Sequence, residues 1–271
     1  MAARTEEIVA FLDELLAIDG FADMGPNGLQ VPGGETVTTV VTGVSGQLEL
    51  FERAAAHGAE LVIVHHGILW EFEPRRIGAA QAKRLKTLLA NGIALAAYHL
   101  PLDAHPELGN NALLAAGLGA DAVERAFDHK GRPIGAIATF GGDPPGAGAP
   151  ASDPGPLAGD GIPAAELFAR VATLTDRDPL VFDAGPDRVR RLGIVSGSAA
   201  NDLTTAIELG LDAFMTGEPK EHVMAQAREN GIHFIAAGHY ATETFGIRRV
   251  GELVAERFGV EHRFLDIPNP V

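Results

Sequence analysis

The sequence predicts an α/β fold, and three observations carry that prediction. Short apolar runs rich in β-branched residues alternate with helical patterns along most of the chain. The same alternation occurs twice in the same order, which indicates two related α/β lobes. The length of 271 residues suits one large domain or two small ones, and a core of that size needs no disulfide or metal to fold.

The N-terminal part begins with an expected amphipathic helix over residues 1–16. Acidic residues such as Glu6 and Asp13 interrupt any apolar segment there, so this stretch does not read as a signal peptide. Further along, expected strands cover residues 37–44, 60–64 and 93–98, and expected helices cover residues 48–56, 79–90 and 110–116. Because no apolar run approaches the roughly 18 residues needed to span a bilayer, we expect a cytoplasmic protein without a membrane segment.

The second lobe repeats short motifs of the first. Val-Ser-Gly at residues 44–46 recurs at 195–197, and Asn-Gly-Ile at 91–93 recurs at 230–232, each time beside an expected strand. A general likeness among α/β units is the alternative explanation. Gly-Ala-Glu at residues 58–60 is matched by Gly-Leu-Asp at 210–212, and these three matched points in the same order favour two related halves of one domain, over residues 1–126 and 188–271.

A segment of different composition lies between the halves. Residues 127–187 form the expected connector, and residues 141–163 within it are dense in Gly, Pro, Ala and Ser. Such a composition cannot sustain a helix or a central strand, so we expect an exposed, mobile loop there. A strand over 134–140 and a helix over 164–172 are expected on either side of it, and a strand over 189–195 opens the second half.

The composition excludes several functions. The chain has 21 basic and 36 acidic residues, with a net charge of −15, and this charge argues against nucleic acid as a partner. Cysteine is absent, which removes disulfides, thiolate catalysis and thiolate metal sites. Any metal ion must therefore be held by histidine and carboxylate side chains.

Polar clusters follow the expected strands at the point where each strand ends. In parallel sheets the carboxyl ends of the strands converge on one crevice, so these side chains are expected to lie together. The clusters are His65-His66, His99 with Asp103, Gly217-Glu218, and His239 with Glu243. Each one alone also fits an ordinary role: loop histidines, a turn aspartate, an acidic helix start before a proline, or a surface helix.

Taken together, five of these residues suit a pair of divalent ions. The expected ligands are His65, His66, Asp103, His239 and Glu243. Their nitrogen and oxygen donors suit two ions per chain with one shared carboxylate, assigned to Glu243, and such sets accept Zn, Mn, Fe, Co or Ni. His99 and Glu218 are the expected catalytic residues, which would carry protons. The alternative for His99 is a histidine of the core, and the alternative for Glu218 is an acidic residue at the start of a helix.

The same residues resemble a known family, the dinuclear metal centre proteins, also called the GTP cyclohydrolase 1 type 2 homologs. The segments that carry the resemblance span nearly the whole chain: Asn27-Gly28-Leu29-Gln30, Gly43-Val44-Ser45, Val64-His65-His66-Gly67, Tyr98-His99-Leu100-Pro101-Leu102-Asp103, Gly217-Glu218, Gly238-His239-Tyr240-Ala241-Thr242-Glu243 and Ile267-Pro268-Asn269-Pro270.

The resemblance has consequences for the site and the assembly. It places the family's ligand pattern on the five residues chosen above, and it implies that two α/β lobes face each other across a dinuclear metal site. It also implies a toroidal homohexamer built as a trimer of dimers, with the metal sites facing an internal cavity.

Two functions are then in competition. The first is a metal-dependent hydrolase that activates water against a nucleotide or similar small substrate, as the GTP cyclohydrolase name of the family implies. For this function, the arginine pairs at 75–76 and 248–249 are the candidates to contact a phosphate group. The alternative is that they are ordinary solvated surface residues. The second is a non-catalytic metal-binding hexameric scaffold that docks a partner or regulates it.

Overall fold

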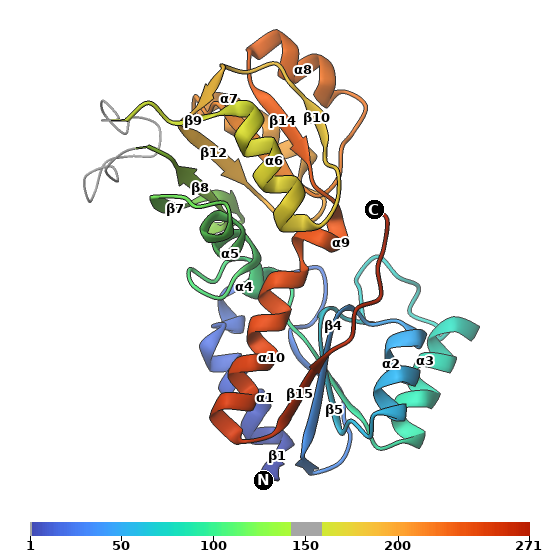
Figure 1. Cartoon of the computed structure of the whole chain (residues 1–271). Coiled ribbons are helices and arrows are strands. Elements are labelled where there is room, and N and C mark those ends of the chain that lie inside the picture. The colour runs from blue at the N-terminus through green and yellow to red at the C-terminus, as the bar shows by residue number, and fades with distance from the viewer. Residues whose placement is uncertain (1, 142–158) are drawn as a thin grey trace. The chain divides into compact units, whose positions relative to one another are not determined.

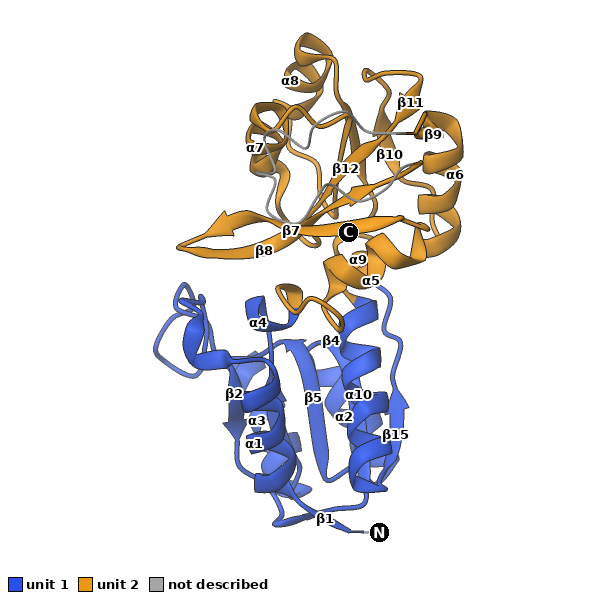
Figure 2. Ribbon diagram, turned by 90° about the vertical axis from the view of Figure 1, so that its left-hand side faces the viewer, with its two compact units in different colours: residues 1–102, 244–268 blue, residues 103–243, 269–271 orange. Residues whose placement is uncertain are grey.

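The computed structural model describes residues 2–141 and 159–271 (Figure 1). Most of the loop expected at 141–163 therefore lies outside the described residues. The chain divides into two compact units (Figure 2): unit 1 comprises residues 1–102 and 244–268, and unit 2 comprises residues 103–243 and 269–271. The predicted ranges of the two halves and the connector follow a different division of the chain and stay a prediction.

Unit 1 is built on a five-stranded sheet in the order β15-β4-β5-β6-β2. The strands are β15 (Glu261–Phe264), β4 (Thr39–Ser45), β5 (Leu61–His66), β6 (Ala94–Ala97) and β2 (Gly28–Val31). The first four are mutually parallel, and β2 runs antiparallel to β6 at one edge. As a result, β4, β5 and β6 bring their carboxyl ends to the same edge of the sheet.

Four helices cover this sheet (Figure 1). On one side lie α1 (Thr5–Leu15) and α10 (Thr244–Phe258), and on the other lie α2 (Leu48–Ala56) and α3 (Ala79–Ala90). Phe51 of α2 and Leu88 of α3 are fully buried in one apolar cluster with Val62 of β5. A short pair, β1 (Ala3–Arg4) with β3 (Thr36–Val37), and a 3-10 turn at Ile18–Gly20 complete the unit.

Unit 2 is built on a six-stranded sheet in the order β10-β14-β13-β12-β8-β7. The strands are β10 (Leu180–Phe182), β14 (His233–Ala236), β13 (Ala213–Thr216), β12 (Arg191–Ile194), β8 (Arg132–Thr139) and β7 (Ala122–His129). Only β12, β13 and β14 are parallel. The expectation of a largely parallel sheet thus holds for unit 1, whereas unit 2 is mixed.

The sheet of unit 2 has antiparallel strands at both edges: β10 pairs with β14 at one edge, and a tight hairpin forms the other. Strands β7 and β8 pair from Ala122↔Thr139 to His129↔Arg132, and the two residues between them, Lys130 (φ 51°) and Gly131 (φ 87°), both have positive φ. Two such residues make the turn whose twist matches that of paired strands. The hairpin then adds to β12 through β8 in antiparallel register.

The remaining elements of unit 2 surround the sheet. Helices α7 (Leu203–Glu208) and α8 (Val223–Asn230) pack on it through Leu203 and Val223, which join Phe214 and Phe234 in one buried cluster. The other helices are α5 (Asn110–Gly117), α6 (Ala164–Thr175), α9 (His239–Thr242) and the 3-10 turn Ala200–Asp202. A short strand pair joins β9 (Ile162–Pro163) to β11 (Arg188–Val189). Helix α4 (Leu100–Asp103) begins in unit 1 and ends at the first residue of unit 2.

The two units share a detailed local design. In unit 1 the carboxylate of Glu60 accepts the backbone N–H groups of Thr38 (3.1 Å) and Thr39 (2.9 Å) at the start of β4. In unit 2 the carboxylate of Asp212 likewise accepts the N–H groups of Arg190 (2.8 Å) and Arg191 (3.0 Å) at the start of β12.

Glycines repeat in the same way. In unit 1, Gly58 (φ 68°) precedes β5 and Gly92 (φ 65°) precedes β6. In unit 2, Gly210 (φ 63°) precedes β13 and Gly231 (φ 65°) precedes β14. These matches agree with the repeat seen in the sequence, and the whole is a mixed α/β fold.

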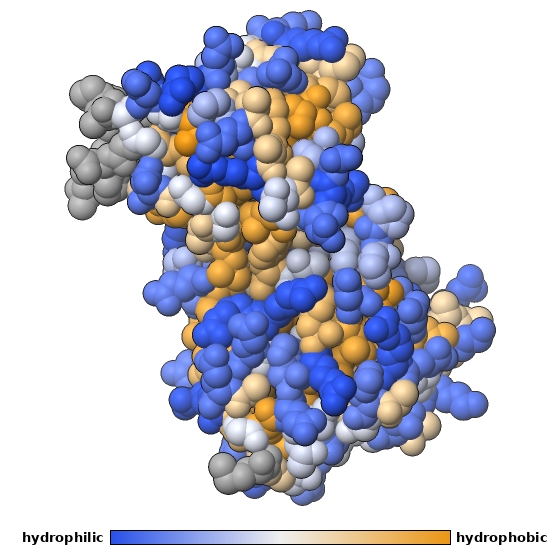
Figure 3. Space-filling model, in the orientation of Figure 1, coloured by the Kyte–Doolittle hydropathy of each residue, from blue (hydrophilic) through white to orange (hydrophobic). Residues whose placement is uncertain are grey.

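Hydrophilic residues cover much of the face shown in Figure 3, with apolar residues scattered among them. Among the residues that the structure describes, no helix has the length and apolar character needed to cross a bilayer.

Candidate metal centre

Unit 1 gathers three histidines at the carboxyl ends of its strands. His65 and His66 end β5, and His99 follows β6. Each offers one ring nitrogen within 4.8 Å of those of the other two, an arrangement that could hold a metal ion. The ring centroid of His65 lies 4.8 Å from that of His66 and 5.1 Å from that of His99. The parallel strands thus bring together residues that are more than thirty positions apart in the sequence.

Each of the three rings has a partner at Nδ1. His65 is fully buried, and its Nδ1 donates to the carbonyl of Tyr98 at 2.9 Å. His66 Nδ1 lies 3.2 Å from the hydroxyl of Ser45 at the end of the neighbouring strand. His99 Nδ1 donates to the carboxylate of Asp23 at 2.7 Å. These contacts fix the orientation of the three imidazoles.

Asp23 was not among the candidates from the sequence. Its side chain is 2% exposed, and it accepts further hydrogen bonds from the backbone of Leu100 (3.0 Å) and the amide of Asn27 (3.0 Å). Burial by itself would raise the pKa of Asp23, but the hydrogen bond and charge of His99, together with the other donors, lower it to about 2. The carboxyl is therefore ionised at neutral pH.

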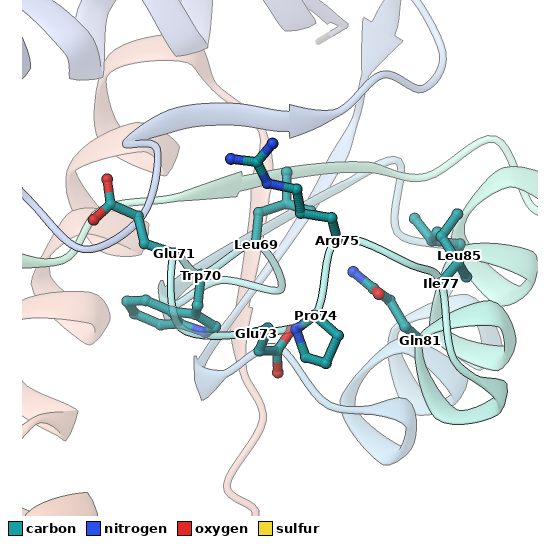
Figure 4. A pocket seen from close by; sticks show the side chains of 9 residues that line it. All are labelled: Leu69, Trp70, Glu71, Glu73, Pro74, Arg75, Ile77, Gln81 and Leu85. Carbon is teal, nitrogen blue, oxygen red and sulfur yellow. The ribbon is translucent and has the colours of Figure 1, made fainter.

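Trp70 connects the histidines to a nearby pocket. The ring of Trp70 meets that of His99 edge-on at 5.2 Å between centroids and stacks on Phe72 at 5.6 Å. Trp70 also lines a pocket of about 500 Å³ together with Leu69, Arg75 and Ile77 (Figure 4). Trp70 thus forms part of the wall of this pocket.

The arginines expected to contact phosphate differ in their surroundings. Arg75 lines the pocket. Arg249, by contrast, pairs with Glu252 and Glu256 along α10, both at 3.1 Å. The guanidinium of Arg248 lies 3.7 Å from the centroid of the Phe264 ring.

In unit 2, His239 stands between two carboxylates. It opens α9 directly after β14, its Nε2 lies 3.2 Å from Oε2 of Glu243, and its Nδ1 pairs with Oε1 of Glu218. Burial would lower the pKa of His239, but the hydrogen bonds and charges of Glu243 and Glu218 raise it to about 9. Glu243 is buried, whereas about a third of the Glu218 side chain is exposed.

Two glycines make room for this arrangement. Gly197 has φ +68°, and a Cβ there would lie 2.4 Å from Oε1 of Glu243. Gly238 has φ +96°, and a Cβ there would lie 2.3 Å from Nη1 of Arg177. Gly197 belongs to the repeated Val-Ser-Gly motif, so the sequence signalled a turn but not its contact with Glu243.

Asp103 is the first residue of unit 2. It is buried, and its Oδ1 accepts hydrogen bonds from the amide of Asn110 (2.8 Å) and the hydroxyl of Ser196 (3.0 Å). No group of three or more closely spaced ligand atoms among residues 2–141 and 159–271 includes Asp103. The predicted ligands therefore divide into two from unit 1 and three from unit 2.

The residues present fit a transition-metal ion. Imidazole nitrogens beside carboxylate oxygens are the donors that Zn, Mn, Fe, Co and Ni accept, while Ca prefers oxygen alone. A mixed α/β protein with such groups at its strand ends belongs to the class of candidate metal-binding proteins.

Comparison with known proteins specifies the class. The chain belongs to the Duf34/NIF3 (NGG1p interacting factor 3) family, whose model matches residues 3–270. It is 41% identical over 270 residues, covering all of both chains, to a GTP cyclohydrolase 1 type 2 homolog of Pseudomonas aeruginosa. It is also 41% identical over 268 residues to the homolog of Escherichia coli K12, covering 98% of this chain and 99% of the relative. The resemblance seen in the sequence is thereby confirmed.

Solved structures agree with the fold. The chain superposes on protein ybgI, of unknown function, with a TM-score of 0.86 and 40% identity, covering 99% of this chain and all of the other. It superposes on TTHA1606 from Thermus thermophilus with a TM-score of 0.85 and 35% identity over the same shares. Reduced HcgD from Methanocaldococcus jannaschii, at 21% identity and a TM-score of 0.80 over 98% and 99% of the chains, shares the fold.

Proposed function

We propose that this protein binds two divalent metal ions through His65, His66, Asp103, His239 and Glu243. The observation that carries the proposal is the histidine group of unit 1, whose ring nitrogens lie within 4.8 Å of one another. The pairing of His239 with Glu243 adds a nitrogen and an oxygen donor in unit 2. Glu243 is our choice for a carboxylate shared by both ions.

We further propose that the protein is a metal-dependent hydrolase of a nucleotide or a similar small substrate. When bound, a pair of divalent ions supplies Lewis acidity that makes water a nucleophile near neutral pH. The nucleotide is suggested by the name of the 41%-identical relatives, GTP cyclohydrolase 1 type 2 homologs. The pocket that Trp70 lines supports a ligand with a flat ring, which the indole can contact, while Arg75 is accompanied there by the carboxylates of Glu71 and Glu73.

Glu218 is the residue that we assign to proton transfer in this reaction. Its carboxylate accepts a hydrogen bond from Nδ1 of His239. Because the Glu218 side chain is partly exposed, it can exchange protons with solvent. It would hold the His239 ring in one orientation and pass a proton to or from the substrate. The sequence predicts the same role for His99, which is paired with Asp23.

A scaffold without catalysis is the second candidate. Phe72 is 71% exposed and Ile77 64% exposed in the segment after the histidine pair, and large apolar side chains at a surface favour contact with another chain. The toroidal homohexamer and the cytoplasmic location implied above remain part of this proposal. In this alternative the ions stabilise an assembly or a docking surface rather than activate water.

Metal content and turnover, measured on the same preparation, test these proposals. The protein is purified without added metal, its metal content per chain is measured by mass spectrometry, and GTP turnover is then assayed with that metal restored. The hydrolase is supported if the wild-type protein holds two metal ions per chain and turns over GTP, if His65→Ala loses this turnover, and if the surface control His57→Ala keeps it. Two equivalents without turnover favour the scaffold and call for other nucleotide substrates. No binding even after reloading contradicts the metal proposal.

A further inference from the structure

We propose that His99 is itself a metal ligand, a sixth one, and that Asp23 is its positioning residue. This inference rests on the proposed metal binding and gives His99 a different role from the proton transfer predicted from the sequence. It also gives unit 1 a set of three imidazoles that can hold one divalent ion without any ligand from unit 2. Three distinct observations lead to it.

The first observation is the compactness of the three rings. The centroid of His99 lies 5.1 Å from that of His65 and 5.5 Å from that of His66. One ring nitrogen of each lies within 4.8 Å of the other two, a spacing that a single ion can span with small side-chain adjustments. Any ion held by His65 and His66 therefore has the His99 ring beside it.

The second observation is the engagement of Nδ1 in every ring. A histidine that binds a metal through Nε2 usually donates its other N–H to a carboxylate, a backbone carbonyl or a comparable acceptor, which fixes the ring. His65 donates to the carbonyl of Tyr98 and His99 to the carboxylate of Asp23. Nε2 is consequently the coordinating nitrogen of both rings. The Asp23 carboxylate therefore holds the His99 ring in place.

The third observation comes from the internal repeat. His99 follows β6, the third parallel strand of unit 1, just as His239 follows β14, the third parallel strand of unit 2. Each is followed four residues later by a carboxylate, Asp103 or Glu243. Each also has a carboxylate at Nδ1: Asp23 for His99, and Glu218 for His239. If His239 is a ligand, the residue in the equivalent place is expected to be one as well.

The proposal has a direct consequence for metal content. The histidines of unit 1 form a neutral donor set, typical of sites that bind Zn or Co with three protein ligands and an open position. One ion should therefore remain in the full-length protein when the ligands of unit 2 are removed. The five-ligand assignment alone leaves only His65 and His66, too few for a stable site.

The experiment uses the full chain carrying Asp103→Asn, His239→Gln and Glu243→Gln, which removes all three proposed ligands of unit 2. Its binding of Co²⁺ is measured by titration and by metal content after gel filtration, and we expect one retained ion. Adding His99→Ala should weaken that binding by more than about 100-fold, because loss of an orienting partner alone costs roughly 10–100-fold. Asp23→Asn should weaken it by about 10-fold or more. His57→Ala, an exposed histidine, is the matched control.

Proton NMR of the Co²⁺ protein in water separates a ligand from a merely structural residue. An imidazole bound through Nε2 keeps its Nδ1 proton, which gives a strongly shifted, exchangeable resonance. His99→Ala should remove one such resonance and leave those of His65 and His66. His99→Gln, whose amide can still donate to Asp23, provides a second variant if the alanine variant fails to fold.

The outcomes separate this inference from the proposed function. Unchanged affinity and an unchanged set of shifted resonances in both His99 variants would overturn it, even where the wild-type protein binds two ions. Loss of one resonance together with weaker binding would support it. Absence of Co²⁺ binding in the wild-type protein would instead defeat the proposed metal binding, and the role of His99 with it.

Discussion

Small residues beside the candidate metal ligands decide how closely those side chains can approach the backbone. Gly197 is the clearest example, because a Cβ at this position would lie 2.4 Å from a carboxylate oxygen of Glu243. The sequence showed Gly197 only as part of a repeated turn motif. Asp23 was missed for a related reason: it contacts His99 from 76 positions away, and no local pattern marks such a pair.

Replacement of Gly197 by alanine is expected to weaken metal binding. The new Cβ would displace Glu243, and the positive φ of +68° adds backbone strain of about 1 kcal/mol. Gly210→Ala is the matched control in the same unit, since it has φ +63° and nothing within 4 Å of its Cβ position. Both variants should lose similar thermal stability, but only Gly197→Ala should lose affinity in a metal titration. Equal affinities would show that Glu243 is not a ligand.

At the scale of elements, local signals determined what could be predicted. The bounds of α2 and α3 match the predicted 48–56 and 79–90 because clear stop residues follow each helix. The antiparallel β7–β8 hairpin was not recognised, since Lys130-Gly131 is not one of the strong hairpin signals and β7 has a mixed polar pattern. The long helix α10 was also missed, because its first turns follow directly on the polar cluster at His239.

Helix α10 depends on a glycine for its contact with the neighbouring strand. A Cβ at Gly251 would lie 2.0 Å from Nε2 of His262 on β15. Gly→Ala inside a helix ordinarily stabilises by about 0.5–1 kcal/mol. Here the overlap should outweigh that gain, and we expect Gly251→Ala to destabilise by about 1–3 kcal/mol. Thermal unfolding measures this, with Gly78→Ala, which meets nothing within 4 Å, as the control; a raised melting temperature would contradict the packing.

The same contact makes stability depend on pH. Burial lowers the pKa of His262 below 6.5, and the ring nitrogen pairs with the hydroxyl of Thr42 at 2.8 Å. The unfolded chain therefore binds a proton more readily than the folded one, so this contribution is complete above pH 6.5 and is lost as the pH falls below it. His262→Gln should flatten the decline in melting temperature between about pH 7 and pH 5. An unchanged slope would exclude His262 as a cause.

At the scale of the molecule, the candidate ligands could be predicted because both units repeat one strand arrangement. His65 and His66 end the parallel strand β5, and His239 follows the parallel strand β14, while the role of all five residues as ligands stays a prediction. The repeat is visible in the matching roles of Glu60 at the start of β4 and Asp212 at the start of β12. The residues that orient the ligands could not be predicted. They lie on segments such as the stretch before β2, where neither periodicity nor spacing indicates a function.

Metal ions are expected to link the unfolding of the two units, since the proposed ligands come from both. Ions that bind only the folded protein raise its stability by about 2.7 kcal/mol at a hundredfold excess over Kd. Calorimetry should give one transition at higher temperature with Co²⁺ or Zn²⁺, and a lower or divided transition with a chelator. His65→Ala should respond less to the metal. A metal-independent profile in the wild-type protein would contradict this linkage.

The discontinuity of unit 1 also sets an order on its assembly during synthesis. Strand β15 and helix α10 follow residue 243, so β4 lacks its outer neighbour until residues 103–243 of unit 2 have been synthesised. Unit 2, apart from its last three residues, is complete before then, and domains generally fold as units while the chain is made. The nascent first unit must therefore wait with an open sheet edge, the state most prone to pairing with a neighbouring chain.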